Sequence, residues 1–161
     1  MDGNHENHWL LNRFPVEKWH GGRVHRISDS VVHLMRGEIF EIAGKRFFVF
    51  GGADSIDKQW RKPGISWWPE EIPSREEMDA GQAGLEQVGN RVDYIVTHEC
   101  PTEVYRRLYD PVPIRPYILT EYLQWLEENT SFDKWYFGHH HVDRDVDEKH
   151  VALYQNVVRI V

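Results

Sequence analysis

Two stretches of the sequence decide the fold: VDYIVTHE at Val92–Glu99 and KWYFGHHH at Lys134–His141. Each stretch begins with a short apolar run, Val92–Thr97 in the first and Lys134–Phe137 in the second, and ends in polar residues that include histidine. A short apolar run bounded by polar or turn residues is typical of a buried strand. We therefore predict two strands whose ends carry chemically active side chains.

Helical patterns lie around these strands. Pro101–Tyr109 predicts a short helix with proline at its first position. Upstream, the capping-box pattern Ser74-Arg75-Glu76-Glu77 predicts a helix that runs to about Val88. An amphipathic helix that ends near Asn129 is indicated by apolar residues with helical spacing, namely Leu119, Tyr122, Leu123 and Leu126. The alternation of strands and helices predicts an α/β fold with mixed β-sheets flanked by helices.

Further strands are predicted on either side of this region. On the N-terminal side they are Val31–Met35, Glu38–Ile42 and Arg46–Phe50. On the C-terminal side we predict a closing hairpin whose strands, Val151–Tyr154 and Val157–Val161, turn at Gln155-Asn156.

Composition limits the classes of function. The chain has 161 residues, and we expect a single domain over residues 1–161. The net charge of −7 argues against non-specific binding to nucleic acid phosphates. Cys100 is the only cysteine, so no internal disulfide can form and a reducing compartment fits. No apolar run reaches membrane-spanning length and no signal peptide is recognisable, so we expect a cytoplasmic protein without a membrane partner.

Three polar clusters contain the candidate site residues: Gly3–Glu6 (GNHE), Thr97–Glu99 (THE) and Gly138–His141 (GHHH). In open α/β sheets the loops at the carboxyl ends of the strands converge on the ligand site. Two of the clusters follow predicted strands, and the first would follow one if a strand preceded Gly3. We therefore expect the three clusters to meet in space.

The side chains in these clusters are typical of a metal site. His139 and His141, two residues apart after a strand, can both reach one site if the backbone turns. Imidazole nitrogen suits Zn, Fe, Mn or Ni, whereas the carboxamide oxygen of Asn4 is a harder ligand. Mixed nitrogen and oxygen ligation indicates a hydrolytic metal rather than a closed structural zinc site, which normally uses cysteines. We expect a divalent metal cofactor, Mn, Fe or Zn.

In this order, the motifs GNHE, TH and GHxH resemble the last three motifs of the calcineurin-like metallophosphoesterases, and the resemblance spans Gly3 to about Val161. It implies hydrolysis of phosphomonoesters or phosphodiesters at two metal ions that bind a bridging hydroxide. It also implies that one ion binds Asn4, His98 and His139, and that the other ion binds His141.

The same resemblance gives roles to the rest of the GNHE motif. His5 would be the catalytic histidine, which stabilises the phosphoryl oxygens or protonates the leaving group. Glu6 would orient a neighbouring group. Outside the motifs, Asp54 would face the site from a strand end, and Arg61, in the long loop Lys58–Pro73, would bind phosphate. The alternatives are a turn residue for Asp54 and an exposed, charged loop for Arg61.

Two motifs of that family, Asp-x-His and Gly-Asp-x-x-Asp, would precede GNHE and do not occur here in that order. The resemblance implies that they supply most ligands of the ion that binds His141 and the carboxylate that bridges both ions. We therefore expect a truncated metallophosphoesterase-like domain that lacks its N-terminal portion and has an incomplete dinuclear site. We also expect an open sheet edge and an uncovered apolar face, which must be refolded, self-paired or covered by a protein partner.

Three functional interpretations stay open. In the first, the chain descends from a metal-dependent hydrolase of phosphoesters. In the second, it is a non-catalytic binding protein, an inhibitor or regulator of another protein, that reuses the phosphoesterase scaffold. In the third, it is part of a split enzyme whose site another segment or chain completes. Two further residues receive no catalytic role: Cys100 is expected to be buried, and His8 is expected at the surface.

Overall fold

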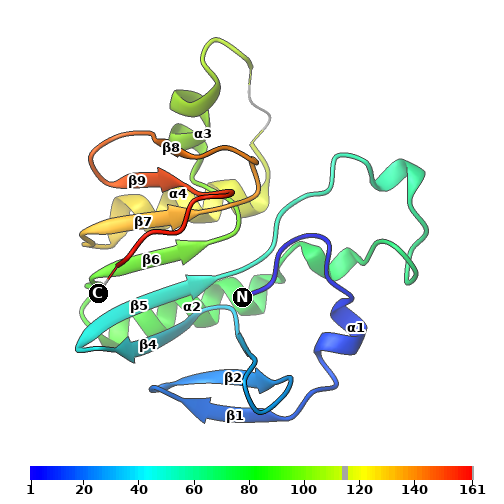
Figure 1. Cartoon of the computed structure of the whole chain (residues 1–161). Coiled ribbons are helices and arrows are strands. Elements are labelled where there is room, and N and C mark those ends of the chain that lie inside the picture. The colour runs from blue at the N-terminus through cyan, green and yellow to red at the C-terminus, as the bar shows by residue number, and fades with distance from the viewer. Residues whose placement is uncertain (114–115, 161) are drawn as a thin grey trace.

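The structure of the protein, a computed structural model, describes residues 1–113 and 116–160. It contains two β-sheets and several helices, so the predicted mixed α/β architecture is confirmed (Figure 1). The larger sheet has six strands in the order β4-β5-β6-β7-β9-β8. Its strands are β4 (Glu38–Ile42), β5 (Lys45–Phe50), β6 (Tyr94–Thr97), β7 (Lys134–Phe137), β8 (Arg144–Asp145) and β9 (His150–Ala152).

Strands β5, β6, β7 and β9 run parallel to one another, and the edge strands β4 and β8 run antiparallel to their neighbours. The central strands read KRFFVF, YIVT and KWYF, because a parallel strand is covered on both faces and needs apolar residues on both. Phe50, Thr97 and Phe137 lie in register at the carboxyl ends of β5, β6 and β7. The residues that follow these three positions therefore leave the sheet at the same edge.

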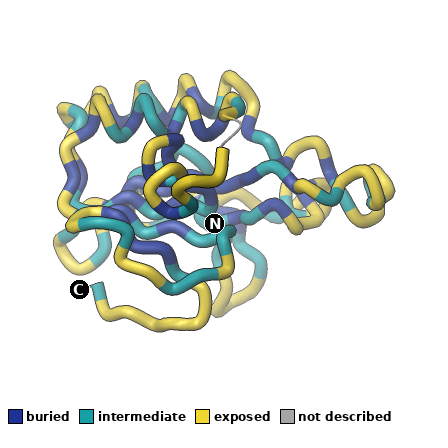
Figure 2. Tube along the Cα trace, turned by 90° about the horizontal axis from the view of Figure 1, so that it is seen from above, coloured by how far each residue is buried: buried dark blue, intermediate teal, exposed yellow. Residues whose placement is uncertain are grey.

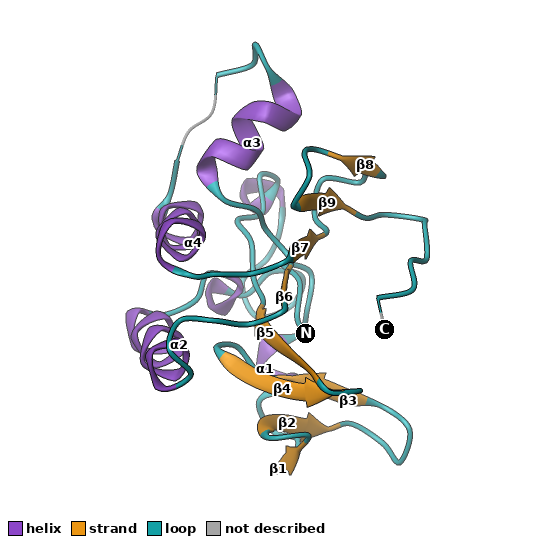
Figure 3. Ribbon diagram, turned by 90° about the vertical axis from the view of Figure 1, so that its left-hand side faces the viewer, coloured by secondary structure: helices purple, strands orange, loops and turns teal. Residues whose placement is uncertain are grey.

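Three helices lie on one face of the larger sheet: α2 (Arg75–Gln87), α3 (Thr102–Tyr109) and α4 (Ile118–Asn129) (Figure 3). They confirm the three helical patterns of the sequence. The capping box at Ser74 forms as predicted, with Ser74 Oγ accepting from the Glu77 N–H and the Glu77 carboxylate accepting from the Ser74 N–H. Within residues 1–113 and 116–160, no helix combines the length and the apolar character needed to cross a bilayer.

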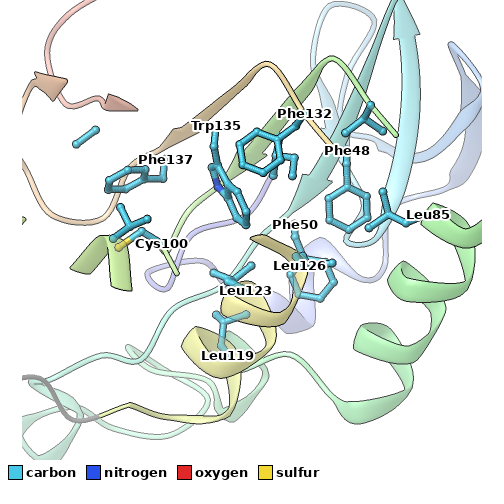
Figure 4. Packing of buried hydrophobic residues seen from close by; sticks show 14 of the residues in the cluster. Phe48, Phe50, Leu85, Cys100, Leu119, Leu123, Leu126, Phe132, Trp135 and Phe137 are labelled. Carbon is cyan, nitrogen blue, oxygen red and sulfur yellow. The ribbon is translucent and has the colours of Figure 1, made fainter. Parts of the chain in front are cut away.

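The main core lies between these helices and the sheet (Figure 4). Helix α4 contributes the apolar stripe that its spacing predicted, with Leu119, Leu123 and Leu126 fully buried. Trp135 and Phe50 of the sheet pack in the same cluster. This packing holds the carboxyl ends of β5 and β7 in place, and the candidate site residues follow directly from those ends.

A smaller sheet has the order β1-β2-β3 and comprises β1 (Val16–Trp19), β2 (Gly22–Arg26) and β3 (Val32–Leu34). Only the last of these strands was predicted. The hairpin between the first two turns at His20 and Gly21, where φ is 49° and 94°. Positive φ at both residues suits a two-residue hairpin, but histidine is a weaker signal for this turn than asparagine or aspartate.

Strand β4 is an edge of the larger sheet, and the hairpin of the smaller sheet meets it. The N–H of Glu41 donates to the carbonyl of His20 at 2.7 Å, and the guanidinium of Arg23 pairs with Glu38 at 2.6 Å. Behind these contacts lies a second apolar cluster of Val24, Phe40, Phe47 and Val49. This part of the expected open edge is therefore covered within the chain.

The predicted C-terminal hairpin is wrong. Strand β9 ends at Ala152 and pairs with β8, and residues 155–160 form no strand. The reason is Asp143, whose carboxylate accepts hydrogen bonds of 2.8 to 3.2 Å from the N–H groups of Tyr154, Gln155 and Asn156. These bonds bend the chain away from the sheet just after β9. Val161, the last residue of the predicted hairpin, lies outside the described residues.

The loop between β5 and α2 projects from the body of the molecule, and most of its distal part is exposed (Figure 1; Figure 2). It contains two short 3-10 helices, η1 (Lys58–Trp60) and η2 (Pro69–Glu71). The exposed fractions of its apolar side chains Ile56, Trp60 and Ile65 are 91%, 79% and 73%. The two ends of the loop, at Ser55 and Glu71, are by contrast buried.

Candidate metal site

The three polar clusters of the sequence meet at the carboxyl edge of the larger sheet. The N–H of His98 donates to the carbonyl of Phe50 at 3.3 Å, and the N–H of Gly138 donates to the carbonyl of His98 at 3.1 Å. These bonds extend the strand ladders, so the clusters after β6 and β7 leave the sheet side by side. The N–H of Gly52, just past β5, donates to the carbonyl of Asp2 at 3.2 Å and brings the N-terminal cluster to the same edge.

The N-terminal cluster is anchored by a buried carboxylate. Asp2 is 2% exposed and accepts from His33 Nε2 at 3.0 Å and from Arg36 Nη2 at 2.6 Å. Burial alone would raise the pKa of Asp2, but the hydrogen bonds and charges of His33 and Arg36 outweigh burial and hold this pKa well below its ordinary value. Asp2 is therefore an ionised anchor for Asn4 and His5, which follow it closely.

Asn4 and His98 place two potential ligand atoms next to each other. Oδ1 of Asn4 lies 3.1 Å from Nε2 of His98. This distance fits a hydrogen bond, and neighbouring ligands that each lie about 2.1 Å from one divalent ion are also about 3.0–3.4 Å apart. Gly3 permits the approach, because a Cβ there would lie 3.0 Å from Cε1 and Nε2 of His98. The close approach of the His98 ring to Gly3 therefore explains why a glycine suits this position of GNHE.

Burial favours the neutral form of the histidines at this position. Burial, and then the proximity of His139, lowers the pKa of His98 to about 4. Burial likewise lowers the pKa of His139. The centroids of the two rings are 5.2 Å apart. Neutral imidazoles keep the lone pair that a metal ligand requires.

The backbone of the GHHH cluster turns sharply. His139 and His141 both have left-handed backbone, with φ of 63° and 52°. Residues other than glycine adopt this conformation rarely, and such strain concentrates at functional sites. The turn lets His139, His140 and His141 line one cavity, and the ring of His141 also stacks on Tyr154 with centroids 4.7 Å apart.

Glu99 is a site residue that the motif roles left out. Its carboxylate accepts from His140 Nε2 and from the N–H of Cys100, both at 2.8 Å, and from the hydroxyl of Tyr117 at 3.0 Å. Nε2 of His139 lies 3.7 Å from the same carboxylate. Burial would raise the pKa of Glu99, but the hydrogen bond and charge of His140 outweigh it and lower this pKa. A buried carboxylate of this kind fixes the imidazole that donates to it, here His140, and no spacing pattern in the sequence singles Glu99 out.

Glu99, Cys100 and His140 also form a compact group that could hold a metal ion, because one ligand atom from each lies within 4.8 Å of the others. Cys100 is buried, as the sequence predicted, and its Sγ lies 3.3 Å from Nε2 of His140. Burial, and then the charge of Glu99, raises the pKa of the Cys100 thiol well above its ordinary value. In this structure the three side chains are joined by the hydrogen bonds of Glu99 and Cys100 with His140 and lie directly behind the GHHH turn.

The site opens into a cavity of 820 Å³. Part of its lining is polar and includes Asn4, His5 and the histidines of the GHHH cluster. Another part is aromatic and comes from α3 and from the segment before α4: Tyr105, Tyr109 and Tyr117. The cavity is much larger than a phosphate group, so it has room for a phosphoester with an organic substituent.

The remaining predicted site residues differ in their placement. Asp54 lines the cavity, but its carboxylate pairs with Nζ of Lys58 at 2.5 Å. Glu6 accepts a backbone hydrogen bond of 3.3 Å within its own loop. Arg61 donates to the carboxylate of Asp57 at 2.7 and 2.8 Å and lies outside the cavity lining. The structure therefore brings Asp54, but not Arg61, to the site.

His8, which we expected at the surface, is buried. It begins the short helix α1 (His8–Leu11), and only 3% of it is exposed. Together with His25 and His33 it lines a second, smaller cavity of 230 Å³. No sequence pattern indicates this placement, because a helix of four residues is too short to produce a periodic apolar pattern.

Comparison of the chain with protein-family models, with curated proteins and with solved structures gives no match. The functional assignment therefore depends on the motifs and on the geometry of the site.

Proposed function

We propose that this chain is a calcineurin-like metallophosphoesterase domain whose fold corresponds to the C-terminal part of that family's layered domain. The observation that carries the proposal is the meeting of the GNHE, TH and GHHH clusters at one sheet edge, with Oδ1 of Asn4 3.1 Å from Nε2 of His98. In this proposal a divalent ion, Mn, Fe or Zn, binds Asn4, His98 and His139.

The donor set fits one ion. Asn4 supplies a hard oxygen, and His98 and His139 supply neutral nitrogens, a combination that these metals accept. Of the ligands named by the family resemblance, His141 alone remains for a second ion, and one imidazole without an anion holds a dication weakly. We therefore propose one ion for the chain by itself, and a second ion only where another segment or chain supplies carboxylates.

The proposed substrates are phosphomonoesters and phosphodiesters. The ion, when bound, offsets the negative charge of the phosphoryl group. His5 is exposed and lines the cavity beside Asn4, so its imidazole can donate a proton to the leaving oxygen. Glu99 hydrogen-bonds with His140, the neighbour of His139 in the turn, and so supports the GHHH cluster.

Metal binding is the first test of this proposal. The wild-type chain is expected to bind Mn²⁺ in a calorimetric titration, and His98→Ala is expected to weaken binding by at least about 100-fold, because an inner ligand is lost. His20→Asn is the matched control, since His20 is exposed, lies away from the site and has a left-handed backbone that asparagine tolerates. Equal affinities of the wild type and His98→Ala would contradict the site.

Hydrolysis is the second part of the same test. With Mn²⁺ present, hydrolysis of aryl phosphate mono- and diesters is expected, and His5→Ala is expected to lower kcat by about 10²–10⁴-fold while leaving metal affinity unchanged. An unaltered kcat in His5→Ala would contradict the proposed role of His5 as the proton donor.

A non-catalytic binding protein is the second candidate function. The observation that favours it is the projecting loop, where Ile56 and Trp60 are 91% and 79% exposed. Exposed apolar side chains gathered on one feature are typical of a protein contact surface. Metal binding without any hydrolysis, together with self-association that Trp60→Ser abolishes in sedimentation experiments, would favour this function over the first.

A further inference from the structure

The carboxamide of Asn4 has two chemically different ends, and only its oxygen can bind a metal ion. Which end faces His98 depends on the partner of the other end. Nδ2 of Asn4 donates to Oγ of Ser55 at 3.0 Å, so Oδ1 turns toward His98. Nδ2 also lies 3.5 Å from Nε2 of His5, at the outer limit of a hydrogen bond, so the shorter bond to the Ser55 hydroxyl is the stronger determinant of the Asn4 orientation.

Glu71 settles the direction of the Ser55 hydroxyl. Oγ of Ser55 donates to Oε2 of Glu71 at 2.6 Å, and the backbone N–H of Ser55 donates to Oε1 at 2.8 Å. A hydroxyl has one proton, and here that proton points to Glu71. Toward Asn4 the Ser55 oxygen can then only accept, which requires the N–H₂ end of the carboxamide to face it.

This relay is built into the base of the projecting loop. Ser55 is 2% exposed and Glu71 is fully buried, at the two ends of that loop. Gly52 lets the ends approach, because it has φ of 92° and a Cβ there would lie 2.5 Å from the carbonyl oxygen of Glu71. The exposed tip of the loop and its buried base are thus separate features, and the base contacts the candidate ligand.

We propose that Ser55 and Glu71 are positioning residues that hold the Asn4 carboxamide with its oxygen toward the metal position beside His98. The inference rests on the proposed function, because it concerns the hydrogen bonds that orient Asn4, one of the proposed metal ligands. Residues that hydrogen-bond to a metal ligand orient that ligand and affect metal affinity without touching the ion.

Glu71→Gln reverses the relay without changing its shape. The fixed N–H donor of Ser55 requires the oxygen of the new amide, so its N–H₂ group faces the Ser55 hydroxyl. The hydroxyl proton then turns toward Asn4 and favours the flipped carboxamide, with nitrogen toward His98. We expect the Mn²⁺ affinity of Glu71→Gln, measured by the electron paramagnetic resonance of free Mn²⁺, to fall by about 10–100-fold.

A second background separates positioning from simple structural support. Asn4→Asp presents oxygen at both ends, and its carboxylate can accept from the reversed hydroxyl. In that background, Glu71→Gln is expected to leave Mn²⁺ affinity unchanged or to increase it. Ser55→Ala, which removes the relay atom, is expected to weaken binding by about 10-fold with Asn4 present and not with Asn4→Asp. If Glu71→Gln fails to fold, the comparison of Ser55→Ala in the two backgrounds tests the relay in its place.

The outcomes are distinguishable. Loss of affinity with Asn4 and no loss with Asn4→Asp supports the relay. An equal loss in both backgrounds, or no loss in either, overturns the relay and leaves the proposed metal site standing. Absence of Mn²⁺ binding by the wild-type chain overturns the proposed function and the relay with it.

Discussion

Asp2→Ala is expected to lower the free energy of unfolding by about 3–5 kcal/mol, the usual effect of removing one partner of a buried ion pair. The side chains of Asp2 and Arg36 are 2% and 7% exposed, and their closest atoms are 2.6 Å apart. Among the residues that the structure describes, the substitution leaves the buried Arg36 guanidinium only the half-exposed Glu77 as an acidic partner, and it removes the acceptor of His33. The loss of stability is large because the buried N–H groups of Arg36 and His33 no longer have the Asp2 carboxylate as acceptor.

Denaturant unfolding of the two proteins measures this difference. The matched control is Arg75→Ala, which breaks the pair of Arg75 with Asp79, whose side chains are 75% and 61% exposed. An exposed pair of this kind contributes about 0–1 kcal/mol. A loss in Asp2→Ala that is no larger than the loss in the control would contradict the role of Asp2 as an anchor.

The same pair predicts how stability depends on pH. Burial opposes ionisation of Asp2, but His33 and Arg36 outweigh it, and the pKa of Asp2 in the folded chain is lowered. Its stabilisation is therefore fully present above the unfolded value of about 3.9 and is lost as pH falls below it. The stability difference between the wild type and Asp2→Ala is expected to be constant near neutral pH and to shrink in acid. A difference that grows as pH falls would reverse the sign of this prediction.

Trp135→Ala is the second large effect, with an expected loss of about 3–5 kcal/mol of unfolding free energy. Trp135 is completely buried and packs against Phe132 and other residues of the main core (Figure 4). Its Nε1 also donates to Oγ1 of Thr97 at 2.7 Å, and that hydroxyl donates to the carbonyl of Glu99 at 2.5 Å. The substitution therefore leaves a cavity and also releases the strand end that leads into the candidate site.

Thermal and denaturant unfolding test this prediction against a second tryptophan. Trp60→Ala removes the same side chain from the projecting loop, where 79% of it is exposed. Its effect is expected to stay within about 0.5 kcal/mol, as for most surface substitutions. Similar losses in the two variants would mean that burial of Trp135 does not explain its contribution.

Where local patterns were strong, the sequence predicted the elements well. The strands β5, β6 and β7 and the three helices on the sheet appear where apolar runs, helical spacing and the capping box indicated them. The failures have local causes. The hairpin turn at His20-Gly21 has histidine where asparagine or aspartate is usual, and backbone hydrogen bonds to the Asp143 carboxylate direct the end of the chain. Neither effect produces a periodic pattern.

The candidate site divides in the same manner. Asn4, His98, His139 and His141 were named from motifs that stand at the ends of apolar runs, and the structure gathers them around one sheet edge. Their role as metal ligands stays a prediction. Three buried polar residues support them: Ser55, Glu71 and Glu99. The sequence did not indicate a supporting role for these residues, because each acts through a hydrogen bond to a residue that is distant in sequence.

By itself, the sequence determined which segments form the layered α/β core and which residue types stand at the ends of its strands, because apolar periodicity and capping are local properties. Only the tertiary structure decided how those residues are held. Asp2 accepts a hydrogen bond from Arg36, Ser55 donates one to Glu71, and Asn4 contacts His98, which lies 94 positions away in the sequence. Contacts of this kind depend on strand register and on the burial of charge, and both arise only when the sheet has assembled.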